Sequence, residues 1–390
     1  MMRGPTYKWK LHVRATGFWI ALAMCGMFLL AIFADFIAND RPLYARINGQ
    51  NHWPVLESLT GQGTTQDTLN YSIAEVLILP LIPFSTDPSE GLNRYEPPLT
   101  SSLKYGRNVY HLLGTDRIGR DVAACMVYGF RKSLLVALFA MFIAGCLGVT
   151  IGMLAGYWGN AARIRRTWPF IVWLLFCLYA GFLFANDLVA GWIWILCLSL
   201  LLLLLPFVLS RSTKGHGVRM PLDDAVLKSI ELFHAVPALM ILLALTALLS
   251  NPTLWQLAVI IGLLKWTTVA RFMRGEVLNI RNLPYVQAAR ISGLSHVKIM
   301  LQYILPQALG PLLVIFAFGI ASVVLLESTL SFLGIGVPPE EITWGKLLSQ
   351  AKSNTKAWWL AIFPGLTIFL LITLLQLSGD EIKRNLNPQD

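Results

Sequence analysis

Long apolar runs dominate the hydrophobic pattern of this 390-residue chain. Each run approaches the roughly 20 residues that a helix needs to cross the ~30 Å hydrocarbon core of a bilayer. The pattern predicts eight membrane-crossing helices, at about 17–38, 131–156, 168–186, 188–209, 232–250, 254–272, 307–333 and 358–378. Composition agrees, because mean hydropathy is +0.61 and only 13% of residues are charged, against about 25% in soluble domains. We expect an all-α polytopic membrane protein.

The basic residues predict how the chain is oriented. Residues 1–16 contain four basic and no acidic side chains, so the positive-inside rule places the N-terminus in the cytoplasm. Residues 39–130 then form an extracytoplasmic segment, whereas the basic stretches around Arg163 and Arg211 return to the cytoplasm. Eight crossings are an even number, which leaves the C-terminus cytoplasmic as well.

Charge and cysteine content exclude other classes of protein. The net charge of +10 arises from short segments beside apolar runs, so it reflects topology and predicts contact with membrane lipid and not with nucleic acid. Four of the five cysteines lie in apolar runs, and residues 39–124 contain none. A disulfide framework or a zinc knuckle in the external segment is therefore excluded.

The polar segment between the sixth and seventh predicted spans has the pattern of two short helices joined by a turn. Pro284 suits the first position of a helix, and Gly293 suits the left-handed position beyond its end. Ser295 is a candidate N-cap of a second helix that runs to Pro306 at the foot of the next span. Coupling helices are accordingly expected within 281–305.

One face of the first coupling helix is predicted to consist mainly of small residues. Tyr285, Ala288, Ala289 and Ser292 recur at helical spacing, and small side chains allow a partner surface to approach closely. Such a knob could pass force from a soluble motor to the membrane helices. The alternative interpretation is an ordinary interhelical loop with a glycine turn.

At these residues the chain resembles the inner-membrane permeases of ATP-binding-cassette (ABC) importers. Their cytoplasmic signature is Glu-Ala-Ala, three residues, Gly, nine residues, then Ile-x-Leu-Pro. The matching positions are Ala288, Ala289, Gly293, Leu305 and Pro306. Gln287 replaces the acidic residue and Tyr303 replaces the isoleucine, so any salt bridge of the family's Glu is not expected here.

Further motifs resemble the dipeptide, oligopeptide and nickel branch of that family. These are the stretches 111–121, 327–336, 344–345, 363–366, 379–380 and 387–388, and residues 37–42 are similar to the branch for microcin-type peptides. Residues 160–219 fit no part of the pattern and are predicted to be an inserted transmembrane hairpin, peripheral and not a docking element. The resulting division is 1–16 cytoplasmic, 17–38 first span, 39–130 external, 131–158 second core span, 160–219 insertion and 220–390 remaining permease core.

The resemblance implies a six-helix permease core in a bacterial inner membrane that imports peptides or peptide-like solutes. The chain lacks Gly-x-x-x-x-Gly-Lys-Ser/Thr, so ATP hydrolysis is expected in a separate subunit and no catalytic residue or cofactor is expected here. The implied partners are a second permease subunit, two cytoplasmic ATPase subunits and an extracytoplasmic solute-binding protein. The predicted coupling residues are Tyr285, Gln287, Ala288, Ala289, Ser292, Gly293, Leu305 and Pro306.

Ionisable residues within the spans are candidates for a translocation path. Lys265 either lines the path or extends its ammonium to the nearby headgroups beside Arg271, and the second interpretation is favoured. Glu327 falls near the outer end of its span, too far for a bond to Lys265. The stretch His111–Asp121 could hold a metal, but a capped turn is favoured.

Three alternative functions stay open at this point. A nickel or metal-chelate permease would share the same machinery. An ion-coupled secondary carrier needs acidic groups within the membrane, for which Glu327 is nearly the sole candidate. A membrane enzyme is disfavoured because the sequence brings no nucleophile–base pair or paired carboxylates into one leaflet.

Overall fold

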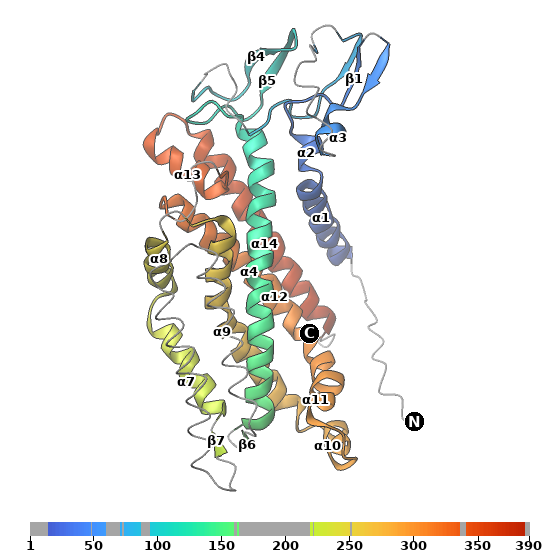
Figure 1. Ribbon diagram of the computed structural model, residues 1–390, viewed down its shortest axis with the longest axis vertical. Coiled ribbons are helices and arrows are strands. Elements are labelled where there is room, and N and C mark those ends of the chain that lie inside the picture. The colour runs from blue at the N-terminus through green and yellow to red at the C-terminus, as the bar shows by residue number, and fades with distance from the viewer. Residues whose placement is uncertain are drawn as a thin grey trace, which may run out of the picture.

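The computed structural model is a bundle of long helices with short strands at both ends (Figure 1). It describes residues 15–47, 49–59, 71, 74–86, 94–159, 162–163, 219–220, 222–249, 252–335 and 341–386. The predicted spans 168–186 and 188–209, and the basic N-terminal segment, lie outside the described residues.

Five long helices form the bundle. They are α1 (Ala15–Ile32), α4 (Val122–Trp158), α9 (Leu254–Ile280), α12 (Leu305–Phe332) and α14 (Trp359–Leu386). Four segments of the described chain are long and apolar enough to cross a membrane, namely α4, α9, the run His296–Phe332 and α14, while α1 is a shorter apolar helix. The all-α prediction for the membrane region is confirmed.

The predicted fifth span, 232–250, is not one straight helix. The chain forms α7 (Leu222–Ala235) and α8 (Ala238–Leu248), which are bent by 76° across the break at Pro237. Proline has no amide hydrogen and its ring clashes with the preceding turn, which favours a break at this position. Pro364, by contrast, lies inside the continuous helix α14.

Glycines hold α4 against α9 at close range. Gly148, Gly152 and Gly156 follow one another at four-residue spacing on α4. A Cβ added at Gly152 would lie 2.4 Å from the carbonyl oxygen of Ala270, well inside contact distance. Without side chains at these positions the two backbones approach closely, which is how membrane helices gain packing energy in the absence of a hydrophobic drive.

The segment between α1 and α4 is built from short strands and turns. Strand β1 (Tyr44–Ile47) pairs antiparallel with both β2 (Gln50–His52) and β3 (Val76–Ile78). Strands β4 (Thr100–Lys104) and β5 (Arg107–His111) form a separate hairpin. Two further helices, α2 (Ala34–Ile37) and α3 (Pro54–Leu59), complete the segment.

The ends of the predicted insertion lie side by side. Strands β6 (Ala162–Arg163) and β7 (Arg219–Met220) pair antiparallel, with Ala162 opposite Met220. The chain therefore departs from the core and rejoins it at one point. Residues 164–218 lie outside the described residues, so the inserted hairpin stays a prediction.

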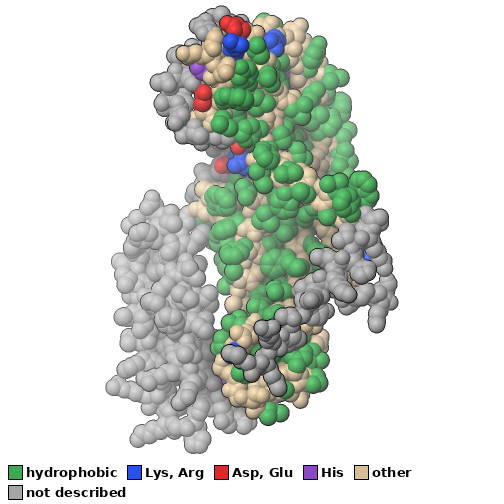
Figure 2. All heavy atoms as spheres, turned by 90° about the vertical axis from the view of Figure 1, so that its right-hand side faces the viewer, with side chains coloured by type: hydrophobic (Ala, Val, Ile, Leu, Met, Phe, Trp, Pro, Cys, Tyr) green, Lys and Arg blue, Asp and Glu red, His purple; other side chains and the backbone are tan. Residues whose placement is uncertain are grey.

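The elements separate into two ends of the molecule. Figure 1 shows the strands β1, β4 and β5 together with α13 (Trp344–Ser353) at one end, and β6, β7 and the segment after α9 at the other. Hydrophobic side chains cover the long middle of the face in Figure 2, while charged side chains gather toward its upper end. This distribution matches a chain whose middle lies in hydrocarbon.

Candidate functional site

The segment after α9 forms the predicted helix–turn–helix. Helix α10 (Pro284–Ile291) begins with Pro284, and Gly293 has a φ of 74°, in the left-handed region that suits glycine. Both features were predicted and are confirmed. Helix α11 (His296–Ile299) follows Ser295, which occupies the predicted N-cap position, although its side chain makes no capping hydrogen bond.

No break separates α11 from the next span. A π-helical turn (Met300–Ile304) joins α11 to α12, and the run His296–Phe332 continues for 37 residues. The expected end of the second helix at Pro306 is therefore wrong. The π turn ends two residues before Pro306, which lies in the first turn of α12, where a missing amide hydrogen costs little. Leu305 and Pro306 open α12.

Helix α10 has an inner and an outer face. Val286 and Ala289 are buried against the bundle, whereas Gln287 and Ala288 are exposed and Ile291 is 88% exposed. The face predicted to meet a partner is thus divided, because Ala289 and the half-buried Tyr285 face inward while Ala288 and Ser292 lie outside. The outward surface is more apolar than predicted, since it includes Ile291.

Polar contacts within this segment are few. The amide of Gln287 donates to the carbonyl of Asn282 at 3.2 Å, which ties the residue in place of the family's Glu to the preceding turn. Burial raises the pKa of Tyr285, and its hydroxyl is buried with no hydrogen-bond partner among the described residues. Tyr285 therefore stays neutral and fills space.

The C-terminal end of α4 anchors the helix–turn–helix. This anchoring was not predicted from the sequence. The hydroxyl oxygen of Tyr157 lies 2.8 Å from Nδ1 of His296, and the guanidinium of Arg290 lies 4.6 Å from the centre of the Tyr157 ring. Arg281 donates to the carbonyl of Gly156 at 2.8 Å. The pair Tyr157-Trp158 at the end of a long apolar run was the available signal.

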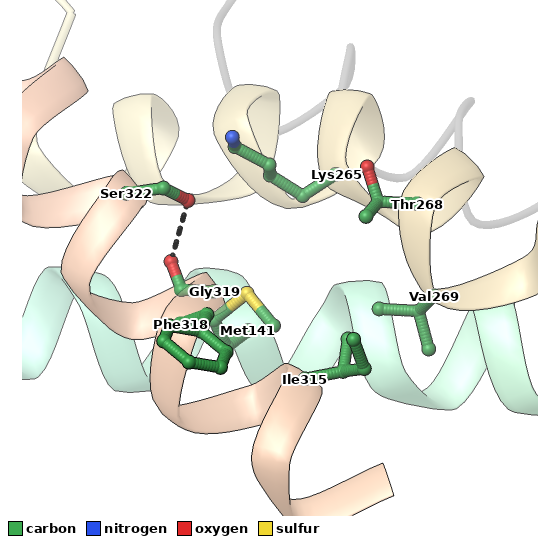
Figure 3. Close-up of a pocket in the computed structure, with 8 residues that line it drawn as sticks. All are labelled: Met141, Lys265, Thr268, Val269, Ile315, Phe318, Gly319 and Ser322. Atoms are coloured by element: carbon green, nitrogen blue, oxygen red, sulfur yellow. Dashed lines mark hydrogen bonds between the residues drawn. The ribbon is translucent and has the colours of Figure 1, made fainter. Parts of the chain in front are cut away.

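A cavity of about 280 Å³ lies between α4, α9 and α12 (Figure 3). Its lining residues are Met141, Lys265, Thr268, Val269, Ile315, Phe318, Gly319 and Ser322. Lys265 is the only charged residue among them. In Figure 3 its side chain extends away from Thr268 and Val269, toward the N-terminal half of α9.

The favoured prediction for Lys265 does not hold in this structure. An ammonium reaching the headgroups beside Arg271 would have to run toward the C-terminal end of α9. Side chains of a helix tilt toward its N-terminus, and Lys265 follows that tilt into the cavity. Lys265 lines the cavity between α4, α9 and α12, and its place in a translocation path stays a prediction.

Glu327 is buried outside the Lys265 cavity. It is 0% exposed, and the hydroxyls of Ser133 and Ser331 donate to its carboxylate at 3.0 and 2.8 Å. It is not among the residues that line the Lys265 cavity. The ion pairs of the described residues do not join it to Lys265, in agreement with the expected separation.

The stretch His111–Asp121 forms a buried polar network at the opposite end of α4. Asp121 caps that helix by accepting from the amide of Ala124 at 2.8 Å, and its other oxygen lies 2.8 Å from Nδ1 of His111. Asp116 pairs with Arg120 at 2.9 Å. The favoured capped turn is confirmed, and the described residues contain no cluster of three potential metal ligands.

Two tryptophans attach this network to the C-terminal part of the chain. The indole of Trp359 donates to the carbonyl of Thr115 at 3.1 Å, and that of Trp344 donates to the carbonyl of Met126 at 2.9 Å. Trp344 also stacks on Phe130. These contacts link α13 and α14 to the start of α4.

Known proteins with similar sequences are transport permeases. Residues 217–388 match the family model for the binding-protein-dependent transport system inner membrane component. The chain is 27% identical to the "Peptidoglycan transport system permease protein YejE" of Agrobacterium fabrum, over 99% of this chain and 93% of that one. It is 26% identical to the "Inner membrane ABC transporter permease protein YejE" of Escherichia coli, over 95% and 93%.

Further matches fall in the same group. The "Di/tripeptide transport system permease protein DppC" of Pseudomonas aeruginosa is 27% identical over 78% of this chain and 80% of its own. Among solved structures, the MetNI methionine ABC transporter matches 67% of this chain and 96% of that chain, with a TM-score of 0.42 and 16% identity.

The apolar helices of the described chain are those of a multi-pass membrane protein, without implying any substrate. Residues 217–388 match the inner-membrane component of binding-protein-dependent transport systems, and the chain is a permease subunit of an ABC importer. Such a subunit works with ATPase subunits and a solute-binding protein.

Proposed function

We propose that this permease forms half of the pathway for peptides or peptide-like solutes. The relatives that cover most of the chain are named for peptide, dipeptide or peptidoglycan transport. A second, related permease subunit completes the pathway, and two ATPase subunits bind on the side of β6, β7 and α10. That side is cytoplasmic and includes both termini, while residues 39–130 and α13 face a solute-binding protein.

The single observation that carries this proposal is the outward face of α10. Leu283 and Ile291 are exposed hydrophobic residues beside exposed Gln287 and Ala288. An exposed apolar surface rimmed by polar residues is typical of a protein–protein contact. We assign this face and the Gly293 turn to ATPase contact, with Tyr285, Ala289, Leu305 and Pro306 supporting it from within.

The inner face of the segment transmits force. Ala289 and Val286 pack with Met273, Val277 and Ile299, which belong to α9 and α11. A push on α10 therefore reaches α9 through this packing and α12 through α11 and the π turn, and both α9 and α12 line the Lys265 cavity. Alternating access requires that the ATPase bind this surface differently in the two states.

Replacement of Gly293 tests the coupling. In Gly293→Leu the new side chain is disfavoured at a φ of 74°, by about 1–2 kcal/mol, and it stands at the proposed contact. We expect ATP-dependent uptake in proteoliposomes to fall at least about tenfold, while membrane insertion and elution in detergent are unchanged. Gly49→Leu, at a φ of 77° in the opposite end of the molecule, is the matched control. Normal uptake by Gly293→Leu would refute the coupling role.

Two alternatives give different outcomes in the same assay. An ion-coupled carrier would take up solute without the ATPase subunits and would stop when an uncoupler is added. A metal-chelate permease would show uptake of nickel complexes in preference to peptides. The ion-coupled alternative would need Glu327 to become accessible, and that residue is fully enclosed in this conformation.

A further inference from the structure

The charge at Lys265 has no compensating anion among the described residues. None of the ion pairs found there includes Lys265. The buried acid Glu327 is already bound by Ser133 and Ser331. A cation held in apolar surroundings costs several kcal/mol unless it is paired or reaches water.

The side chain of Lys265 points away from the nearer charged part of its helix. Lys265 follows Leu254, the first residue of α9, by eleven residues and precedes Arg271 by six. At 1.5 Å per residue these are about 17 and 9 Å along the helix. Since the side chain extends toward the N-terminal half of α9 and into the cavity, a phosphate of the nearer headgroup layer is not its natural partner.

The cavity has one polar end and one apolar wall. Ser322 donates its hydrogen to the carbonyl of Gly319 at 2.8 Å, so its hydroxyl has no hydrogen left for a solute, and the ammonium of Lys265 is the charged donor of the cavity. In Figure 3, Lys265 extends toward the side on which Ser322 lies, whereas Val269 and Ile315 lie at the other side. A cationic donor next to a hydrocarbon wall fits a carboxylate that is attached to an apolar group.

We propose that the Lys265 cavity is a solute-binding station inside the membrane that selects a free carboxylate. The ammonium binds the carboxylate of the passing solute, and Met141, Ile315 and Phe318 contact its hydrocarbon part. This proposal rests on the proposed peptide transport and names the group on the solute that is recognised: the C-terminal carboxylate of a peptide with an apolar last residue.

A cysteine reporter tests the station without measuring transport. In a chain whose five native cysteines are replaced by Ser or Ala, Thr268→Cys places a thiol in the cavity. The complex is embedded in phosphatidylcholine nanodiscs, which offer no anionic lipid. The measured quantity is the labelling rate with a negatively charged methanethiosulfonate, with and without the tripeptide Ala-Ala-Phe or its C-terminal amide.

The expected result separates the acid from the amide. Ala-Ala-Phe should slow the labelling at least about fivefold when Lys265 is present, the amide should not, and Lys265→Met should abolish the protection. Lys265→Arg should retain it. Equal protection by acid and amide, or protection that persists in Lys265→Met, would overturn the proposal.

Failure of the station is distinguishable from failure of the proposed function. Ile291→Cys, in the same chain with Lys265 intact, lies on the exposed face of α10. Its cross-linking to the co-purified ATPase subunits reports the coupling contact alone, and its labelling should not respond to the tripeptide. Cross-linking without protection at Thr268→Cys would leave the permease proposal standing and remove only the carboxylate station.

Discussion

The two ends of helix α4 are held in different ways. At its first turn, Asp121, His111 and the pair Asp116–Arg120 form a buried polar network. At its last turns, α4 packs through glycines against α9 and touches the helix–turn–helix mainly through Tyr157. The first end is fixed by buried directional bonds, whereas the second combines glycine packing with the hydrogen bonds of Tyr157 and Arg281.

The difference indicates which end can move. A buried polar network is fully satisfied in one geometry and costly in any other, so the end with α13 is built to stay fixed. Contacts between glycines and small apolar side chains impose no preferred bond direction, so α4 and α9 can shift against each other at modest cost. We infer that ATPase binding moves the end of α4 beside the helix–turn–helix, while the end with the Asp121 network stays in place.

Filling the glycine seam should have the largest effect. In Gly152→Leu the added side chain meets the carbonyl of Ala270, where even a Cβ would lie at 2.4 Å, and both backbones have to separate. We expect loss of the monodisperse complex on size-exclusion chromatography. Gly275→Leu is the control on α9, because a Cβ there meets nothing within 4 Å. A well-folded Gly152→Leu complex would show that the seam is loose, contrary to this comparison.

Breaking the polar network should have a large but smaller effect. Asp116→Ala leaves the 95% buried Arg120 without its carboxylate, and removing one partner of a buried pair costs about 3–5 kcal/mol. We expect a clear fall in the thermal unfolding temperature in detergent. Arg46→Ala, which breaks an exposed pair with Glu75, should lower stability by at most about 1 kcal/mol. Equal shifts for the two variants would mean that the network contributes no special rigidity.

Removing the single hydroxyl that joins α4 to α11 should have the smallest effect. Tyr157→Phe keeps the ring under Arg290 but loses the 2.8 Å contact with His296, worth about 0.5–1.5 kcal/mol. We expect nearly normal thermal stability and a lower ratio of solute transported to ATP hydrolysed, since force passes less directly to α4. Tyr303→Phe, on the same segment, is the control. An unchanged ratio of solute transported to ATP hydrolysed would mean that force passes through α9 and not through the contact between α4 and α11.

Local backbone chemistry was predictable from the sequence at several positions. Pro284, Gly293 and Pro237 restrict φ or the hydrogen bonding of the chain directly, and each lies where its chemistry requires. Asp121 has the spacing of an N-cap, and it forms one. Such signals act within a few residues and therefore need no knowledge of tertiary contacts.

Tertiary contacts decided the features that the sequence did not reveal. Helical spacing groups Ala288 with Ala289, yet α9 and α11 bury only Ala289. The direction of Lys265 depends on space between α9 and α12 that no single segment encodes. The strands between α1 and α4 were also not specified, because their pairing joins residues as many as 34 positions apart, as in Tyr44 and Ile78.

The antiparallel pairing of β6 with β7 has a practical consequence for engineering. Because Ala162 and Met220 are direct partners across two strands, their Cα atoms are about 5 Å apart. A gap of that size accepts a tight turn, a fluorescent protein or an affinity module without stretching the flanking helices. For the same reason, an inserted element could be gained or lost at this position without moving the core helices that flank it.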